Sequence, residues 1–179
     1  GENSKFVFFT GSPAIDEVIH NKITQKKLLE DKYGFKFTGN EILFIQHSVT
    51  TQVEQTKKQI QNILKAFHKV NKPIIAISPN SDPGNNEIFK QLKSFSKSHD
   101  SFKIFKSLPR SDYLGMLKYC NVLVGNSSSG IIEASYFRIP VVNIGERQKN
   151  REKGKNIFDV KGTSSNLIYD MIITTQKIK

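Results

Sequence analysis

A short run of small and polar residues carries the clearest candidate chemistry in this sequence. Residues 125–130 read Gly-Asn-Ser-Ser-Ser-Gly and follow the apolar run 122–124. The two glycines would let a ligand approach the backbone closely, and the serines offer hydroxyl donors. A helix that begins within the serines would also point free backbone N–H groups towards an anion. The run therefore predicts a phosphate or nucleotide site, with the candidates Ser127, Ser128, Ser129 and Gly130.

An acid and a group of bases accompany this run. Glu133 would lie on the first turns of the same helix. It is suited there to accepting hydrogen bonds from a ribose diol, by analogy with the acid of dinucleotide-binding folds. Beyond the next apolar run comes a cationic loop that contains Arg147, Lys149, Arg151 and Lys153. An anionic ligand at this edge would meet these positive charges.

The same residues also have a purely structural interpretation. Serine is a good helix N-cap, and a glutamate in the first turn interacts favourably with the helix dipole. The run matches neither a Walker phosphate loop nor the GxGxxG fingerprint of dinucleotide-binding folds. Local features alone leave both interpretations open.

Three more candidates each follow a different predicted strand: His47, Asn80 and Leu108. In an open parallel sheet, ligands bind outside the carboxyl ends of the strands, so we expect these residues beside the 125–130 run. His47, neutral or protonated, could act there as a charge partner of a phosphate or as a general acid for the leaving group. A histidine after a strand is also a common structural hydrogen-bonding residue.

Apolar runs and helical repeats alternate along the chain. Strands are expected at residues 5–10, 41–46, 74–77, 102–105, 122–124, 141–144 and 156–160. Helical spacing of apolar residues covers 16–31, 52–70, 86–97, 112–119 and 166–176, and another helix begins near Ser128 or Ser129. Ser111 is the expected cap of the 112–119 helix, and Asp112 a cap or loop acid. The repeated strand–helix units predict an α/β fold, an open and mostly parallel sheet with helices on both faces.

Composition narrows the class of protein. The chain has 179 residues, of which 37% are hydrophobic and 24% charged, as in an ordinary single globular domain. It contains no apolar run long enough for a membrane span and no secretion leader, so we expect a cytoplasmic location and no membrane partner. The single cysteine excludes an internal disulfide and a multi-cysteine zinc site, and we expect no metal and no cofactor.

The net charge of +11 raises nucleic-acid binding as an alternative function. The lysines are spread over every predicted helix, and no nucleic-acid motif accompanies them. We therefore interpret them as solvated helix faces and expect no nucleic-acid partner. A basic nucleic-acid-binding module stays as the alternative from another class, and it would show affinity that falls steeply with salt.

Four segments together resemble the C-terminal half of UDP-N-acetylglucosamine 2-epimerases. They are residues 46–51, 78–80, 124–130 with Glu133, and 143–148 with Arg151. Order and spacing agree from about residue 6 to the last helix. The resemblance is greatest to the hydrolysing branch, which releases UDP and N-acetylmannosamine for sialic-acid-type sugars.

The resemblance implies one half of a glycosyltransferase-B-like (GT-B) architecture, in which two Rossmann-like domains enclose the active site. Residues 1–179 would be a single three-layer, UDP-binding domain. The N-terminal domain, which holds the proton-abstracting carboxylates in that family, would be absent from this chain. We therefore expect the chain alone to bind UDP or UDP-N-acetylglucosamine weakly and to be inactive. The full-length protein would form a homodimer.

The resemblance also implies a role for each matching residue. Ser127 and Ser128 would contact the diphosphate, and Glu133 the ribose hydroxyls. Asn80 and Leu108 would border the uracil and nucleotide pocket. Arg147 would lie near the phosphates, and His47 would touch a phosphate or assist the departure of UDP. The same binding surface would include Ser129, Gly130 and Arg151.

The family reaction eliminates UDP to give an unsaturated glycal, and then adds water at the anomeric carbon with inversion at C2. A 6-deoxy diacetamido sugar stays open as the substrate. Within enzymes, the alternative is the nucleotide-binding half of a GT-B glycosyltransferase. A non-catalytic nucleotide sensor is a further alternative.

Overall fold

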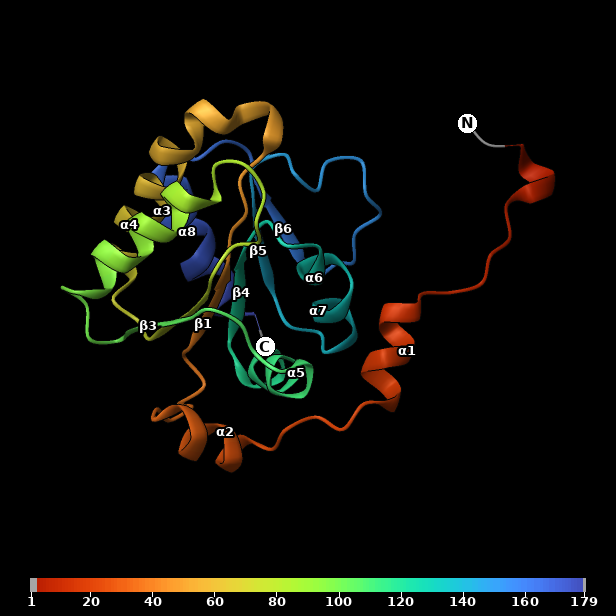
Figure 1. Ribbon diagram of the computed structural model, residues 1–179, viewed down its shortest axis with the longest axis horizontal. Coiled ribbons are helices and arrows are strands. Elements are labelled where there is room, and N and C mark those ends of the chain that lie inside the picture. The colour runs from red at the N-terminus through yellow and green to blue at the C-terminus, as the bar shows by residue number, and fades with distance from the viewer. Residues whose placement is uncertain (1–2, 179) are drawn as a thin grey trace.

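Six parallel strands form the centre of the structure, a computed structural model that describes residues 3–178. Their order across the sheet is β3-β2-β1-β4-β5-β6, so the chain runs from β1 to one edge and then from β4 to the other (Figure 1). The order therefore reverses between β1 and β4, and the connections that leave these two strands diverge. The strands are β1 (Ile42–Ile45), β2 (Ile74–Ile77), β3 (Phe102–Phe105), β4 (Val122–Gly125), β5 (Val141–Ile144) and β6 (Ile157–Val160).

The central strands are apolar on both sides because helices cover both faces of the sheet. All residues of β1, β4 and β5 are buried. Ile42 and Phe44 of β1 belong to the core on one face, whereas Leu43 and Ile45 belong to the core on the other. Buried parallel strands of this kind read as continuous apolar runs instead of alternating ones. The expected α/β fold is confirmed.

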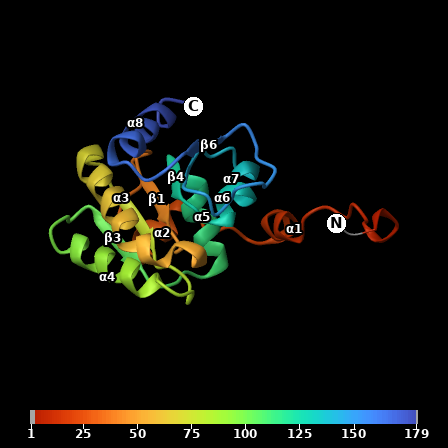
Figure 2. The same cartoon turned by 90° about the horizontal axis from the view of Figure 1, so that it is seen from above.

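Two helical layers enclose the sheet (Figures 1 and 2). One layer contains α3 (Thr56–Val70), α4 (Asn85–Ser96) and α8 (Ser165–Thr175). The other contains α2 (Lys26–Tyr33), α5 (Arg110–Tyr119) and α7 (Glu133–Tyr136). The remaining helices are α1 (Pro13–His20), α6 (Ser128–Ile131) and the 3-10 helices η1 (Ser4–Phe6) and η2 (Thr50–Gln55).

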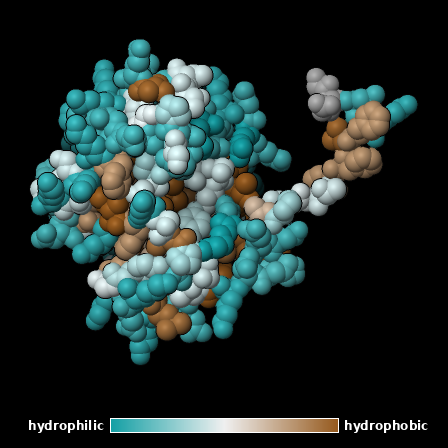
Figure 3. Space-filling view, in the orientation of Figure 1, coloured by the Kyte–Doolittle hydropathy of each residue, from teal (hydrophilic) through white to brown (hydrophobic). Residues whose placement is uncertain are grey.

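The strand expected at residues 5–10 is wrong. This stretch holds the end of η1 and then has no regular secondary structure, and it extends away from the sheet as an arm (Figures 1 and 2). Phe6, Phe8 and Phe9 are 77%, 76% and 103% exposed, and Figure 3 shows apolar residues along the arm. A strand needs a neighbour for its backbone hydrogen bonds, which an apolar, β-branched or aromatic sequence does not itself provide.

Several helix boundaries also differ from expectation. The helix expected over 16–31 is divided into α1 and α2, because the backbone N–H of Thr24 donates to the Ser111 carbonyl and holds the connection extended. The start expected at residue 52 is a 3-10 turn, η2, and the α-helix begins at Thr56. Helix α5 begins at Arg110 with Pro109 as its cap, so Ser111 is not the cap.

Asp112 joins α2 to α5. Its side chain is 5% exposed and accepts hydrogen bonds of 2.6 Å from the Thr24 hydroxyl, the Lys32 ammonium and the Tyr33 hydroxyl. Burial alone would raise the pKa of Asp112, but these three hydrogen bonds and the Lys32 charge lower it to about 2. The carboxylate makes no capping bond to the α5 backbone, so the expected cap role is wrong.

We predict that Asp112→Asn lowers the free energy of unfolding at pH 7 by roughly 2–3 kcal/mol, because a neutral amide cannot form an ion pair with the Lys32 ammonium. The stabilisation by Asp112 is present above the ordinary carboxyl pKa of 3.8 and is lost as the pH falls towards about 2. The difference between variant and wild type should therefore shrink over that range. Urea denaturation at several pH values measures it, with the exposed Asp31→Asn on α2 as control. A difference that stays constant down to pH 2 would contradict this account.

Candidate functional site

A cavity of about 460 Å³ opens where the ends of β1 and β4 diverge. Connections that follow β1, β2, β3 and β4 all contribute to its wall, as expected for the carboxyl edge of a parallel sheet. Five of the residues predicted from the sequence line it together: His47, Asn80, Leu108, Ser127 and Ser129. The others that line it are Ile45, Ile77, Ser78, Pro79, Lys106, Ser107, Arg110 and Tyr113.

Asn126 ties the ends of the two central strands together. Its side-chain carbonyl accepts a hydrogen bond from the His47 backbone N–H, and its side-chain amide donates to the His47 carbonyl, both at 2.8 Å. Its own backbone N–H donates to the Ile45 carbonyl at 3.1 Å. The side chain thus pairs with backbone beyond the last residue of β1, and it fixes the position from which the imidazole enters the cavity.

Gly125 makes this close approach feasible. Its φ is +132°, and a Cβ there would lie 1.9 Å from the Ile45 carbonyl oxygen. Gly130 has a different constraint, since a Cβ added there would lie 3.0 Å from the Val141 side chain. Both glycines therefore serve packing against neighbouring strands, and Gly130 lies outside the cavity wall.

The serines begin a helix of a single turn. Ser127 is the N-cap of α6, and its hydroxyl accepts a hydrogen bond from the Ser129 backbone N–H at 3.3 Å. The capping interpretation is therefore confirmed for Ser127. The Ser129 hydroxyl is hydrogen-bonded to the hydroxyl of the partly buried Tyr113, and desolvation raises the pKa of Tyr113. Because α6 has only four residues, its dipole is small, and its start presents the hydroxyl groups of Ser127 and Ser129 to the cavity.

His47 is half-buried and its Nδ1 faces Asn80. The Asn80 backbone N–H lies 3.3 Å from Nδ1, and the Asn80 side-chain carbonyl lies 3.2 Å from it. Burial lowers the pKa of His47, and the positive charge of Arg147 lowers it further. Asn80 and Asp82 act in the opposite direction but do not outweigh these causes. The imidazole is therefore neutral at pH 7, and a negative ligand beside it would favour protonation.

The basic loop after β5 is attached to the same asparagine. The side chains of Arg147 and Gln148 both donate to the backbone carbonyl of Asn126, at 3.2 and 2.8 Å. Arg147 does not line the cavity, although its charge acts on His47. Arg151 is exposed and also lies outside the cavity wall.

Glu133 lies beside the cavity and is paired with Arg110. The side chain of Glu133 is 8% exposed, and its Oε1 accepts a hydrogen bond of 2.7 Å from Arg110 Nη2. The wall of the cavity includes the arginine but not the glutamate, and it does not include Ser128. Arg110 and Tyr113 were not predicted from the sequence. The one available signal was that Arg110 follows the Leu108-Pro109 corner, another strand end.

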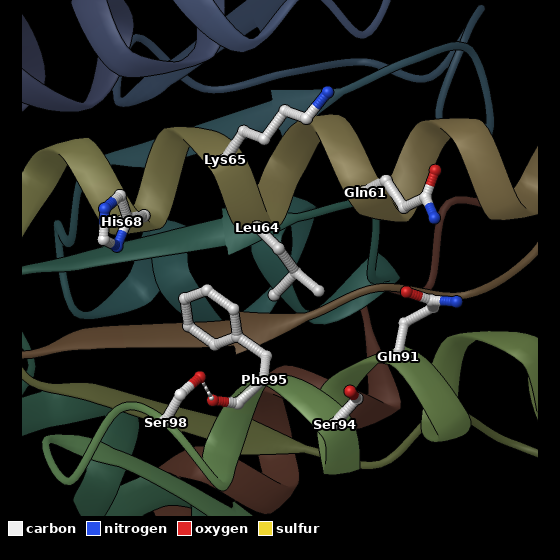
Figure 4. Close-up of a pocket in the computed structure, with 8 residues that line it drawn as sticks. All are labelled: Gln61, Leu64, Lys65, His68, Gln91, Ser94, Phe95 and Ser98. Carbon is white, nitrogen blue, oxygen red and sulfur yellow. Dashed lines mark hydrogen bonds between the residues drawn. The ribbon is translucent and has the colours of Figure 1, made fainter.

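A second hollow, of about 540 Å³, lies between α3 and α4 (Figure 4). Leu64 and Phe95 point into it from the two helices. The polar side chains around them are Gln61, Lys65, His68, Gln91, Ser94 and Ser98. It shares no residue with the strand-end cavity, and we assign no site to it.

Residues 3–178 contain neither a metal-binding cluster nor a membrane-spanning helix. Within that range no three or more His, Cys, Asp or Glu side chains gather in a way that could hold a metal ion. None of the helices described there has the length and apolar character to cross a membrane.

Residues 1–178 match the family model described as UDP-N-acetylglucosamine 2-epimerase. A UDP-N,N'-diacetylbacillosamine 2-epimerase (hydrolyzing) from Legionella pneumophila is 36% identical over 97% of this chain and 45% of its own length. The polysialic acid biosynthesis protein P7 of Escherichia coli is 35% identical over 89% of this chain and 41% of its own. The chain thus spans less than half the length of these relatives.

Solved structures share the fold at low sequence identity. The UDP-GlcNAc 2-epimerase of Methanocaldococcus jannaschii, crystallised with UDP-GlcNAc and UDP, gives a TM-score of 0.71 at 18% identity, over 99% of this chain and 50% of that one. The ADP-heptose heptosyltransferase II of Escherichia coli gives a TM-score of 0.61 at 8% identity, over 84% of this chain and 50% of that one. The expected Rossmann-like, GT-B-related fold is confirmed, and this fold alone does not separate an epimerase from a transferase.

We predict that Asn126→Ala lowers the free energy of unfolding by about 2–3 kcal/mol, because it leaves the backbone N–H and carbonyl of His47 without partners. Urea denaturation measures the loss. Ser128→Ala is the matched control, since the Ser128 hydroxyl makes no hydrogen bond to the residues described. Equal stability of the two variants would show that the strand ends do not depend on the amide.

Arg147→Ala should raise the pKa of His47, because it removes a positive charge that disfavours the imidazolium. An NMR titration of the His47 ring protons measures the change. Lys149→Ala, which removes a neighbouring and exposed charge, is the control and should leave that pKa in place. A pKa of His47 that is unchanged or lower in Arg147→Ala would show that the charge of Arg147 does not lower this pKa.

Proposed function

This chain belongs to the UDP-N-acetylglucosamine 2-epimerase family, and we propose that it is the UDP-binding domain of a hydrolysing member. One observation carries the proposal. The wall of the cavity at the reversal of the sheet combines serine hydroxyls, a half-buried histidine and Arg110, whose partner Glu133 lies beside the cavity. These groups match the parts of a nucleoside diphosphate, which are anionic phosphates and a ribose diol.

The diphosphate binds, on this proposal, beside the start of α6. The hydroxyls of Ser127 and Ser129 line the cavity there and can donate to phosphate oxygens. Ser128 and Arg151 lie outside the wall and would contact the ligand only after a local movement. Arg147 contributes positive charge nearby, and Gly130 contributes indirectly, by letting α6 approach β5.

The nucleoside occupies the remainder of the cavity. Leu108 and Asn80 line it on the β3 and β2 side and would border the uracil. Glu133 accepts hydrogen bonds from the ribose hydroxyls at the margin. The described residues make no hydrogen bond to its Oε2, while Oε1 is occupied by Arg110.

His47 assists the departure of UDP. The imidazole is neutral without ligand, because burial and Arg147 lower its pKa. A bound diphosphate would raise that pKa and favour the imidazolium, which can then donate a proton to the leaving phosphate as the anomeric C–O bond breaks. The electron pair of that bond leaves with UDP. Loss of the C2 proton gives the glycal. Water then adds across the double bond, with its hydroxyl at the anomeric carbon and a proton returned to C2 on the opposite face, which inverts that centre.

The base that removes the C2 proton belongs, on this proposal, to an N-terminal domain of a longer, homodimeric protein of the cytoplasm. The first relatives are more than twice as long as the part that this chain matches. The chain alone would therefore bind UDP without turning over a UDP-sugar. The family match favours this function over that of a glycosyltransferase.

The proposed substrate is a UDP-linked 2-acetamido sugar. UDP-N-acetylglucosamine, which gives N-acetylmannosamine, is the first choice because the family model is described by that sugar. The hydrolysing relative from Legionella pneumophila is named for a diacetylbacillosamine, which supports a diacetamido sugar as the second choice.

Calorimetric titration with UDP at near-physiological salt tests the proposal, with CMP and a short DNA duplex as control ligands. We expect binding selective for UDP, which Glu133→Gln and Ser127→Ala each weaken about tenfold by removing one charged or polar contact. Glu146→Gln is the matched control, because Glu146 is a 63% exposed acid on the same edge of the sheet. Binding of DNA without UDP would overturn the proposal in favour of a basic nucleic-acid-binding module.

A further inference from the structure

Arg110 makes three contacts around the margin of the cavity. Its Nη2 donates to Glu133 Oε1 at 2.7 Å, and its Nε lies 3.4 Å from Glu17 Oε2 on α1. Its guanidinium carbon lies 5.7 Å from the centre of the Tyr113 ring, within the range of a cation–π contact. The guanidinium is thus held between α5, α7 and α1.

Of the two acids, Glu133 is the principal partner. Its side chain is 8% exposed, whereas that of Glu17 is 60% exposed and its oxygen is farther away. An exposed ion pair contributes little, but a buried carboxylate that loses its cation is costly. The contact between Arg110 and Glu133 therefore decides where the carboxylate of Glu133 lies.

The backbone around Glu133 gives the side chain little orientation. Helix α7 has only four residues, Glu133 is its first, and the preceding Ile132 separates it from α6. A glutamate side chain has three torsions and is not fixed by so short a helix. A guanidinium fork, by contrast, holds a carboxylate in a defined plane.

We propose that Arg110 is a positioning residue, which holds the Glu133 carboxylate so that its Oε2 accepts hydrogen bonds from the ribose diol of the nucleotide. The inference rests on the proposed function, because it takes UDP as the ligand. It assigns Arg110 no bond to the ligand, although the arginine lines the cavity. The rival arrangement is direct donation from Arg110 to a phosphate or to the base.

A pair of ligands separates these two arrangements. UDP and 2',3'-dideoxy-UDP differ only in the ribose hydroxyls. The difference between their affinities therefore measures the contribution of the contact between the ribose and Glu133. Calorimetric titration of Arg110→Met should show UDP affinity reduced about tenfold, and dideoxy-UDP affinity changed by less than about twofold. Arg110→Lys, which keeps the charge but not the fork, should recover part of the affinity for UDP.

Two further variants complete the test. In a Glu133→Gln background, Arg110→Met should weaken UDP binding by no more than about twofold, because the effects of two substitutions that break the same contact do not add. Arg138→Met removes an exposed positive charge just after α7 and should leave both affinities unchanged. Thermal melting of each variant confirms that it is folded at the temperature of titration.

The inference is overturned if Arg110→Met weakens both ligands equally, since the arginine would then contact the phosphates or the base. It is also overturned if the losses from Arg110→Met and Glu133→Gln add in full. These results would leave UDP binding itself in place. A wild-type chain that binds neither ligand would overturn the proposed function together with the inference.

Discussion

The side chain of Asn126 holds together the point at which the sheet changes direction. Strands β1 and β4 run side by side and then send their chains apart, so their backbone groups lose their partners just beyond the sheet. The side-chain amide of Asn126 replaces those partners on His47, and the backbone carbonyl of Asn126 accepts hydrogen bonds from Arg147 and Gln148. One residue therefore fixes the connections after β1, β4 and β5. Gly125 is required because any side chain there would strike Ile45.

Helix α5 contributes both to stability and to the candidate site. The two residues responsible, Asp112 and Arg110, lie two positions apart. Asp112 receives donors from α2 and its preceding loop, whereas Arg110 pairs with Glu133 of α7. Each pair places one charged group almost fully out of solvent and supplies its partner from another element. Removing one partner of such a contact destabilises the protein, because the other charge is left buried and unpaired. These contacts therefore specify how the helical layer of α2, α5 and α7 packs. The apolar core beneath supplies burial energy but little of this specificity.

Most of the fold could be predicted from the sequence, because buried parallel strands are continuous apolar runs. The runs at 74–77, 102–105 and 141–144 match β2, β3 and β5 residue for residue. The rule that ligands bind at the carboxyl ends of strands also predicted that His47 and Ser127 lie close together, and both line one cavity. The pairings of Asp112, Asn126 and Arg110 could not be predicted, because each joins residues far apart in sequence through side-chain geometry. The arm was mistaken for a strand because local propensity does not reveal whether a neighbouring strand exists.

That arm bears on the colloidal behaviour of the protein. Phe6, Val7, Phe8 and Phe9 are all more than half exposed, and such a short aromatic and β-branched stretch pairs readily with copies of itself. The net charge of +11 makes the molecules repel one another, and Lys5 places one of those charges beside the stretch. Salt screens the repulsion but leaves the apolar attraction, so the ionic strength of the solution sets the balance between dispersal and self-association.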